Sequence, residues 1–173
     1  KALQVWEFIG VDFMPGKNEL ELEQNDTNGR VGERHVIVVT APGALAALRF
    51  TPTKRQPAAD GKTPLPVLLE PLDANGLVIS ARTPVTLDSA MASNGAASSV
   101  AANWHVRDLN PEEPGVQIFV EGGRALIELL PPAEPGQAVL RATAGSVVGE
   151  ATVNFVPDLR PLIAVGVIEG TLD

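Results

Sequence analysis

Short apolar segments with a period of two constrain the fold of this chain more than any other feature. In Glu19–Gln24 the order ELELEQ places Leu20 and Leu22 on one face and the glutamates on the other, the pattern of a half-buried strand. Comparable segments recur along the chain, with turn residues at intervals of about 8–12 residues, and helical stripes are nearly absent. Aromatic residues make up 4% of the chain, so Val, Leu, Ile and Ala must build the core, which suits packed sheets. The pattern predicts an all-β sandwich.

The N-terminal region reads as a small meander. We expect strands over Leu3–Phe13, Glu19–Gln24 and His35–Thr40, with Asn28-Gly29 forming the turn of a hairpin. Three strands are too few to bury a sheet face of their own. The residues Ala41–Gly43 read as a linker, and a new unit begins after them.

The region 44–157 is predicted to form one sandwich. Its strand Leu65–Asp73 contains Pro66 and Pro71, which favours an edge position or bulges. The small, polar stretch Ala90–Asn103 is expected to form a loop or a weak helix.

The C-terminal strands of this sandwich show the clearest alternation. We expect Ala138, Leu140 and Ala142 to share one face, and Ala151, Val153 and Phe155 to point inward, with Thr152 and Asn154 facing solvent. One further apolar strand is expected in the tail, over Leu162–Ile168.

Charge and composition exclude several functions. The net charge of −8, without a basic patch, argues against a nucleic-acid partner. The chain has no cysteine, so neither disulfides nor thiolate metal sites are available. No apolar run reaches the ~18–20 residues of a membrane-spanning helix, so we expect no membrane insertion by this fragment. The chain has no recognisable signal peptide, and we expect it to be part of a longer polypeptide.

Titratable residues form no catalytic pattern, so we expect a non-enzymatic protein without a required cofactor. The two histidines, His35 and His105, have no third metal ligand at a suitable spacing. The best candidates for ligand contact are Trp104, His105, Arg107 and Asp108, a set suited to stacking on a sugar and recognising its hydroxyls. Trp104 is equally consistent with a place in the core.

Three turns rich in Asp and Asn leave open a calcium site, most naturally at a junction between modules. They are NDTNG, LDANG and DLNPEEPG. Calcium binds such oxygens when several converge. The alternative is that these residues simply form turns, because their side chains bond the nearby backbone.

Two blocks of sequence resemble a known family. The segments ADGKTPLPVLLEPLDANGLVISARTPVTLDS and EGGRALIELLPPAEPGQAVLRATAGSVVGEATVNF are similar to the opening and closing parts of bacterial Ig-like modules of the invasin/intimin type, group 1. This chain departs from the family in an expanded middle region and in the prolines of its first long strand. The resemblance implies an immunoglobulin-like β-sandwich over 44–157, without shared catalytic residues.

The two ends carry resemblances of their own. The segment VDFMPGKNELELEQNDTNGRVGERHVIVV resembles the last strands of bacterial Ig-like repeats, which implies that 1–43 is the C-terminal part of a preceding module. The tail LRPLIAVGVIEG is similar to connectors in large Gram-negative surface proteins, so 158–173 is expected to be a connector strand.

These resemblances imply a stalk or adhesin-type module in a large exported protein of the outer membrane or cell surface, with the periplasm as the alternative. Expected partners are neighbouring Ig-like modules and a host or bacterial surface protein or glycan. The alternative function is a glycan-binding accessory sandwich of a secreted enzyme.

Overall fold

The computed structural model describes residues 5, 7–25, 27–93, 96–98 and 103–158, and they confirm the all-β prediction. Within those residues there is no helix that could cross a bilayer. The strands are β1 Gly16–Asn25, β2 Val31–Ala41, β3 Leu45–Pro52, β4 Ala58–Ala59, β5 Leu65–Asp73, β6 Thr83–Ser93, β7 Ala96–Ser98, β8 Trp104–His105, β9 Val116–Val120, β10 Ala125–Leu129, β11 Gly136–Ala144 and β12 Val147–Pro157.

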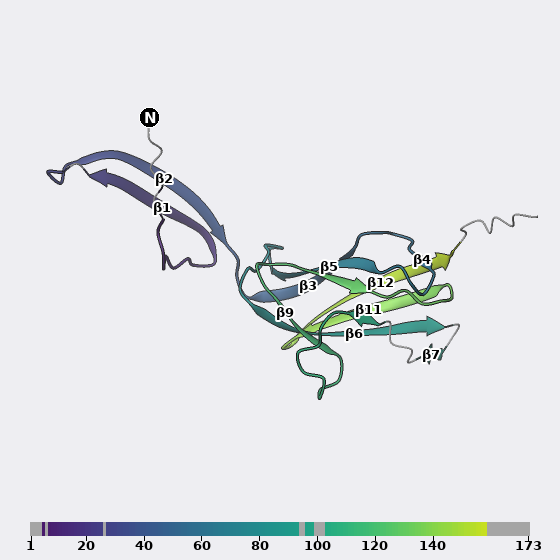
Figure 1. The fold of residues 1–173 in the computed structure, drawn as a ribbon. Coiled ribbons are helices and arrows are strands. Elements are labelled where there is room, and N and C mark those ends of the chain that lie inside the picture. The colour runs from purple at the N-terminus through teal and green to yellow at the C-terminus, as the bar shows by residue number, and fades with distance from the viewer. Residues whose placement is uncertain (1–4, 6, 26, 94–95, 99–102, 159–173) are drawn as a thin grey trace, which may run out of the picture.

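Two sheets pack face to face to form an immunoglobulin-like sandwich (Figure 1). One sheet has the order β3-β5-β10-β8. The other has the order β4-β12-β11-β6-β7, with β9 also paired to β6. The outer edge of β6 is shared, because β9 pairs with Thr83–Leu87 and β7 pairs with Met91–Ser93.

The core lies between these sheets and is built from aliphatic side chains that alternate along each strand. Ala138, Leu140 and Ala142 on β11 are fully buried, and Val153 and Phe155 on β12 are 2% and 3% exposed. Ala151 packs partly buried against the same core. The inward faces predicted for both C-terminal strands are therefore confirmed.

A close approach of backbones at Gly149 joins the two sheets along one side of the sandwich. A Cβ atom at this position of β12 would overlap the Leu48 carbonyl oxygen on β3 and lie 2.7 Å from the Leu48 Cβ. Only glycine leaves room for the two strands at this separation. The side of the sandwich formed by β3 and β12 therefore depends on a missing side chain.

The N-terminal unit is a two-stranded hairpin instead of the predicted three-stranded meander. Strand β1 pairs antiparallel with β2, so that Leu20 lies opposite Ile37 and Glu21 opposite Val36. The hairpin extends away from the end of the sandwich at which β3 begins (Figure 1). The strand predicted over Leu3–Phe13 is wrong for its described residues, which form no ladder. A positive φ at Gly10 interrupts the extended conformation there, and a bend at Pro15 separates this segment from β1.

Of the two alternatives predicted for Leu65–Asp73, an edge position or bulges, the edge position is wrong, because β5 lies between β3 and β10. The β3–β5 pairing does contain one irregularity, between Leu45 and Ala47. Pro66 pairs only with β10, whose partners on β5 end at Leu69, and Pro71 pairs only with β3. On the side away from this partner strand, each proline still accepts a backbone hydrogen bond through its carbonyl, Pro66 from the Thr53 amide at 3.0 Å and Pro71 from the Ile79 amide at 2.9 Å. The strand therefore tolerates the two missing N–H groups at an internal position.

The stretch 90–103 is not simply a loop. Strand β6 continues through Ser93 because the long strand β11 provides partners as far as Gln137, which pairs with Ala92. The short strand β7 then pairs back onto the end of β6. Residues 94–95 and 99–102, and the predicted connector strand Leu162–Ile168, lie outside the described residues.

Candidate functional site

Strand β8 positions the first two candidate residues on opposite sides of its sheet. Trp104 lies opposite Leu129 and His105 opposite Glu128 in the pairing with β10. Since successive side chains of a strand point to opposite faces, one of the pair must face the core and the other solvent.

Trp104 faces the core. Its ring stacks on Phe50, with the ring centroids 6.1 Å apart and an interplanar angle of 14°. The side chain packs against the buried cluster between the sheets, and its buried indole Nε1 has no hydrogen-bond partner among the described residues. The contact joins side chains of the two edge strands of this sheet, β3 and β8. Trp104 therefore lies in the core, which was the alternative to a ligand contact for this residue. A ring in this position is not an exposed platform for a sugar.

His105 lies on the outer face of the same sheet. Its Nδ1 is 3.0 Å from Glu128 Oε2, and both side chains are well exposed. This exposed contact contributes little to stability and leaves the imidazole reachable from solvent. An ion pair also lies on the outside of this sheet, where Arg49 Nη2 is 2.8 Å from Glu70 Oε2, and there the Glu70 side chain is only 11% exposed.

The other two candidates belong to the loop that connects β8 to β9. Asp108 Oδ1 accepts hydrogen bonds from the backbone amides of Asn110 and Gln117, each at 3.0 Å, so this carboxylate holds the loop against the start of β9. Arg107 is exposed and points into an open hollow. The structure therefore brings His105 and Arg107 to the surface, while Trp104 and Asp108 serve the fold.

The hollow beside Arg107 has a volume of about 420 Å³ and includes residues that sequence reasoning missed. The Arg82 guanidinium lies 3.6 Å from the centre of the Phe119 ring, and its Nε is 2.9 Å from Glu121 Oε1. Phe119 is 40% exposed. The signal was the alternation of VQIFV, which buries Ile118 and Val120 and therefore turns Phe119 outward.

The aspartates in the polar turns bind backbone amides. Asp60 Oδ1 accepts from the amides of Lys62 and Thr63, and Asp73 Oδ1 accepts from those of Asn75 and Leu77. These are Asx-type turns, in which the side chain substitutes for a backbone acceptor. Among the described residues, no group of three or more His, Asp or Glu side chains is placed to hold a metal ion. Asp26 of the NDTNG turn lies outside them.

Asp73 makes one contact that reaches beyond its own turn. Its Oδ2 accepts a hydrogen bond of 2.9 Å from the amide of Gly43, in the linker between the hairpin and the sandwich. Asp73 is only 4% exposed. The Gly43 bond is the main reason that the pKa of this carboxyl lies below its ordinary value of 3.8, with the bonds from Leu77 and Asn75 acting in the same direction and burial opposing them.

Comparison with known proteins supports the fold. No family model matches the sequence, and no curated protein matches it. A glycosyl hydrolase family 2 member from Bacteroides cellulosilyticus is similar in structure, with a TM-score of 0.55 and 18% identity over 84% of this chain and 18% of that one. A β-glucuronidase from glycoside hydrolase family 2 gives a TM-score of 0.55 and 18% identity over 87% of this chain and 15% of that one.

A third similar structure is the D00-D0 domain of intimin, with a TM-score of 0.43 and 17% identity over 83% of this chain and 66% of that one. The chain spans less than a fifth of the two glycoside hydrolase chains. At these identities the likeness concerns the sandwich fold alone.

Proposed function

We propose that this chain is a non-catalytic structural or interaction module, of the stalk or adhesin type, in a large exported bacterial surface protein. In this proposal 1–43 is the C-terminal part of a preceding Ig-like module, 44–157 is the Ig-like sandwich, and 158–173 leads to a following domain. The protein would stand at the outer membrane, with neighbouring modules of the same chain as its first partners.

The path of the chain through the sandwich carries the proposal. The chain enters at Leu45, which pairs with Asp73. It leaves along β12, whose last residues Val156 and Pro157 pair with Ala58 and Ala59, beyond the far end of β3. The two connections therefore lie at opposite ends of the long axis (Figure 1). This is the arrangement that lets modules follow one another in a rod.

The polar groups of the described residues support a structural role. The carboxylates of Asp60, Asp73 and Asp108 accept hydrogen bonds from backbone amides in turns. The polar contacts of His105 with Glu128 and of Arg82 with Glu121 lie mostly in solvent. A catalytic site needs perturbed titratable groups gathered in a pocket. A structural module, in contrast, needs only a packed core and well-formed turns.

The test is to place the module on the cell. An antibody against residues 44–157 should bind intact cells that produce the full-length polypeptide, and protease added outside should remove the signal. The sandwich should also be replaceable by an unrelated Ig-like sandwich of similar length without loss of surface display. Antibody binding only after both membranes are opened would place the protein in the cytoplasm and reject the proposal.

A second candidate function is that of a glycan-contacting accessory sandwich in a secreted enzyme. It is supported by the likeness to parts of family 2 glycoside hydrolases and by the exposed Arg107, Arg82 and Phe119 around one hollow. Arginine and an aromatic edge are suited to sugar hydroxyls and the apolar faces of a ring.

The two candidates are separated by a glycan array. A sugar-contacting surface should bind glycans in the wild type and lose them in Arg107→Ala and Phe119→Ala. The control Lys54→Ala, between β3 and β4 and not among the residues that line the hollow, should retain them. Trp104→Ala is unsuitable because this ring belongs to the core. No binding at millimolar concentration would reject the accessory role.

A further inference from the structure

We infer that Asp73 locks the joint between the hairpin and the sandwich, so that the linker Pro42–Ala44 transmits a fixed orientation instead of acting as a hinge. The bond itself is a property of this chain. Its use, in aligning successive modules of a rod, rests on the proposed function. The sequence marks Ala41–Gly43 only as a linker, and the bond from Gly43 to Asp73 comes from the fold.

The sandwich side of the joint is rigid. Asp73 is the last residue of β5, and its backbone amide donates to the Leu77 carbonyl at 2.9 Å while its carbonyl accepts from the Gly76 amide at 3.0 Å. Its Oδ1 accepts from Asn75 and Leu77, both at 2.8 Å. The backbone and one oxygen of Asp73 thus belong to a closed turn, and Oδ2 is held in place to receive the linker.

The linker side offers a single well-placed donor. Pro42 has no backbone N–H group, and the next residue, Gly43, donates to Asp73 Oδ2 at 2.9 Å. Ala41, Pro42 and Gly43 are all half-buried. Because bonds to a charged acceptor are stronger than those between neutral groups, a buried carboxylate is an effective anchor for this short segment.

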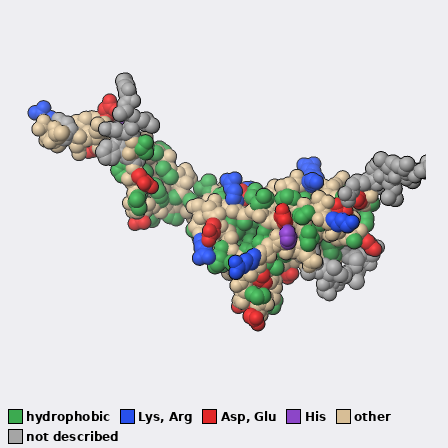
Figure 2. All heavy atoms as spheres, viewed as in Figure 1, with side chains coloured by type: hydrophobic (Ala, Val, Ile, Leu, Met, Phe, Trp, Pro, Cys, Tyr) green, Lys and Arg blue, Asp and Glu red, His purple; other side chains and the backbone are tan. Residues whose placement is uncertain are grey.

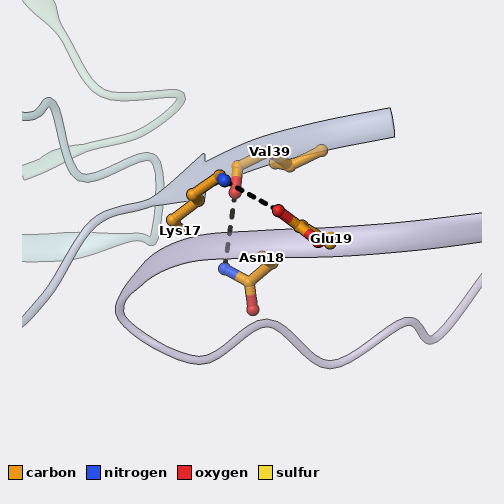
Figure 3. Close-up of polar contacts among 4 residues, drawn as sticks. All are labelled: Lys17, Asn18, Glu19 and Val39. Atoms are coloured by element: carbon orange, nitrogen blue, oxygen red, sulfur yellow. Dashed lines mark hydrogen bonds and ion pairs between the residues drawn. The ribbon is translucent and has the colours of Figure 1, made fainter. Parts of the chain in front are cut away.

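The hairpin side of the joint is braced by Asn18, whose side chain lies between β1, β2 and the chain that precedes them (Figure 3). Its Nδ2 donates to the carbonyls of Met14 at 2.8 Å and Gly16 at 2.9 Å, with a longer bond of 3.5 Å to Val39. Its Oδ1 accepts from the Met14 amide at 2.9 Å. The base of the hairpin is therefore one unit, so holding Gly43 restrains the direction in which the hairpin leaves the sandwich.

The substitution Asp73→Asn removes the bond to the linker and can keep the bonds within the turn. An asparagine can keep one acceptor oxygen toward Asn75 and Leu77, but it then presents an NH₂ group to the Gly43 amide, and two donors cannot bond. The matched control is Asp108→Asn. There a single oxygen, Oδ1, accepts both amides, so the amide side chain can keep both bonds.

The orientation of the hairpin can be measured with two spin labels, because the chain has no native cysteine. Cysteines at the exposed positions 33 on β2 and 134 in the β10–β11 loop would carry the labels, with the distance read by double electron–electron resonance. We expect a single narrow distribution in the wild type and in Asp108→Asn, and a broad one in Asp73→Asn. The Gly43 amide should exchange with solvent at least about tenfold faster, as loss of one bond to a charged group implies.

An unchanged distance distribution and an unchanged Gly43 exchange rate in Asp73→Asn would overturn the inference. It would leave the proposed function standing, because surface display does not depend on this bond. If Asp73→Asn fails to fold, Gly43→Pro removes the donor and leaves the carboxylate. In that variant the Asp73 carboxyl, followed by NMR, should titrate at a higher pH than in the wild type, and an unshifted titration would reject the lock.

Discussion

The hairpin and the sandwich are built from the same alternating strands, yet they differ in what covers their apolar side chains. On β12 Val153 is 2% exposed, whereas on β2 Val36 and Val38 are 64% and 53% exposed, although both strands are eleven residues long. The space-filling view shows the hairpin as a narrow arm beside the thick body of the sandwich (Figure 2). Alternation therefore produces a strand in both places, but only a second sheet turns it into a core.

The difference has a consequence for the hairpin. The apolar run Val36–Val39 lies on a strand whose outer edge has no partner among the described residues, while β1 carries Glu19, Glu21 and Glu23. Charged side chains protect a sheet edge against association, and an uncharged apolar edge invites it. The hairpin is thus the part of the molecule that most needs a neighbour, which agrees with its proposed place in a preceding module.

The largest effect should follow from removing a core aromatic side chain of the sandwich. Phe155→Ala should lower the free energy of unfolding by ~3–5 kcal/mol, through lost burial and a cavity that does not collapse. Asn154→Ser, one residue away on the solvent face, should change it by less than ~0.5 kcal/mol. Both are measured by chemical denaturation. Equal midpoints for the two variants would contradict the observed register of β12.

Adding a methyl group at the contact between the sheets should also destabilise the sandwich. Gly149→Ala places a Cβ against the Leu48 carbonyl, and overpacking of this kind costs ~1–3 kcal/mol. The control is Gly136→Ala on β11, where the nearest atom is the Met91 Cε at 3.3 Å and a flexible side chain can move aside. A thermal melt in which both variants match the wild type would show that β3 and β12 do not approach each other as described.

One substitution made in both regions tests the comparison directly. Val153→Thr buries a hydroxyl without a partner and should cost ~1–3 kcal/mol. Val38→Thr exposes the same hydroxyl to water on the hairpin and should stay within ~0.5 kcal/mol. The measurement is denaturant unfolding monitored by circular dichroism. A loss at Val38 as large as that at Val153 would mean that the face of the hairpin is covered.

The smallest expected effect is the change that Asp73 causes in the free energy of unfolding at acid pH. Because the folded pKa of Asp73 lies below 3.8, its carboxylate stabilises the fold above that value, and this contribution disappears as the pH falls through the folded pKa. The difference in stability between the wild type and Asp73→Asn should therefore be largest near neutral pH and shrink in acid. Its hydrogen-bond partners are the backbone amides of Gly43, Asn75 and Leu77 and the Asn75 side-chain amide, none of which titrates, so no second titration follows from them. A difference that stays constant from pH about 6 to about 2 would contradict the lowered pKa.

Much of the fold follows from local rules. The period of two fixed which residues of β11 and β12 point inward, and Asn28-Gly29 marked the hairpin turn, where Gly29 has a φ of +77°. The candidate site was less predictable. The dipeptide Trp104-His105 places two side chains on opposite faces, and nothing local says which face meets the core.

Neighbouring residues were enough to indicate alternating strands joined by Asp, Asn, Gly and Pro turns, because side-chain direction and turn geometry are local properties. The internal position of β5, the stacking of Trp104 on Phe50 and the bond of Gly43 to Asp73, thirty positions away, follow only from the assembled fold. Each of these depends on which distant strands meet. The sequence indicates a linker at Ala41–Gly43, but only the fold brings a buried carboxylate from another strand to accept the Gly43 amide.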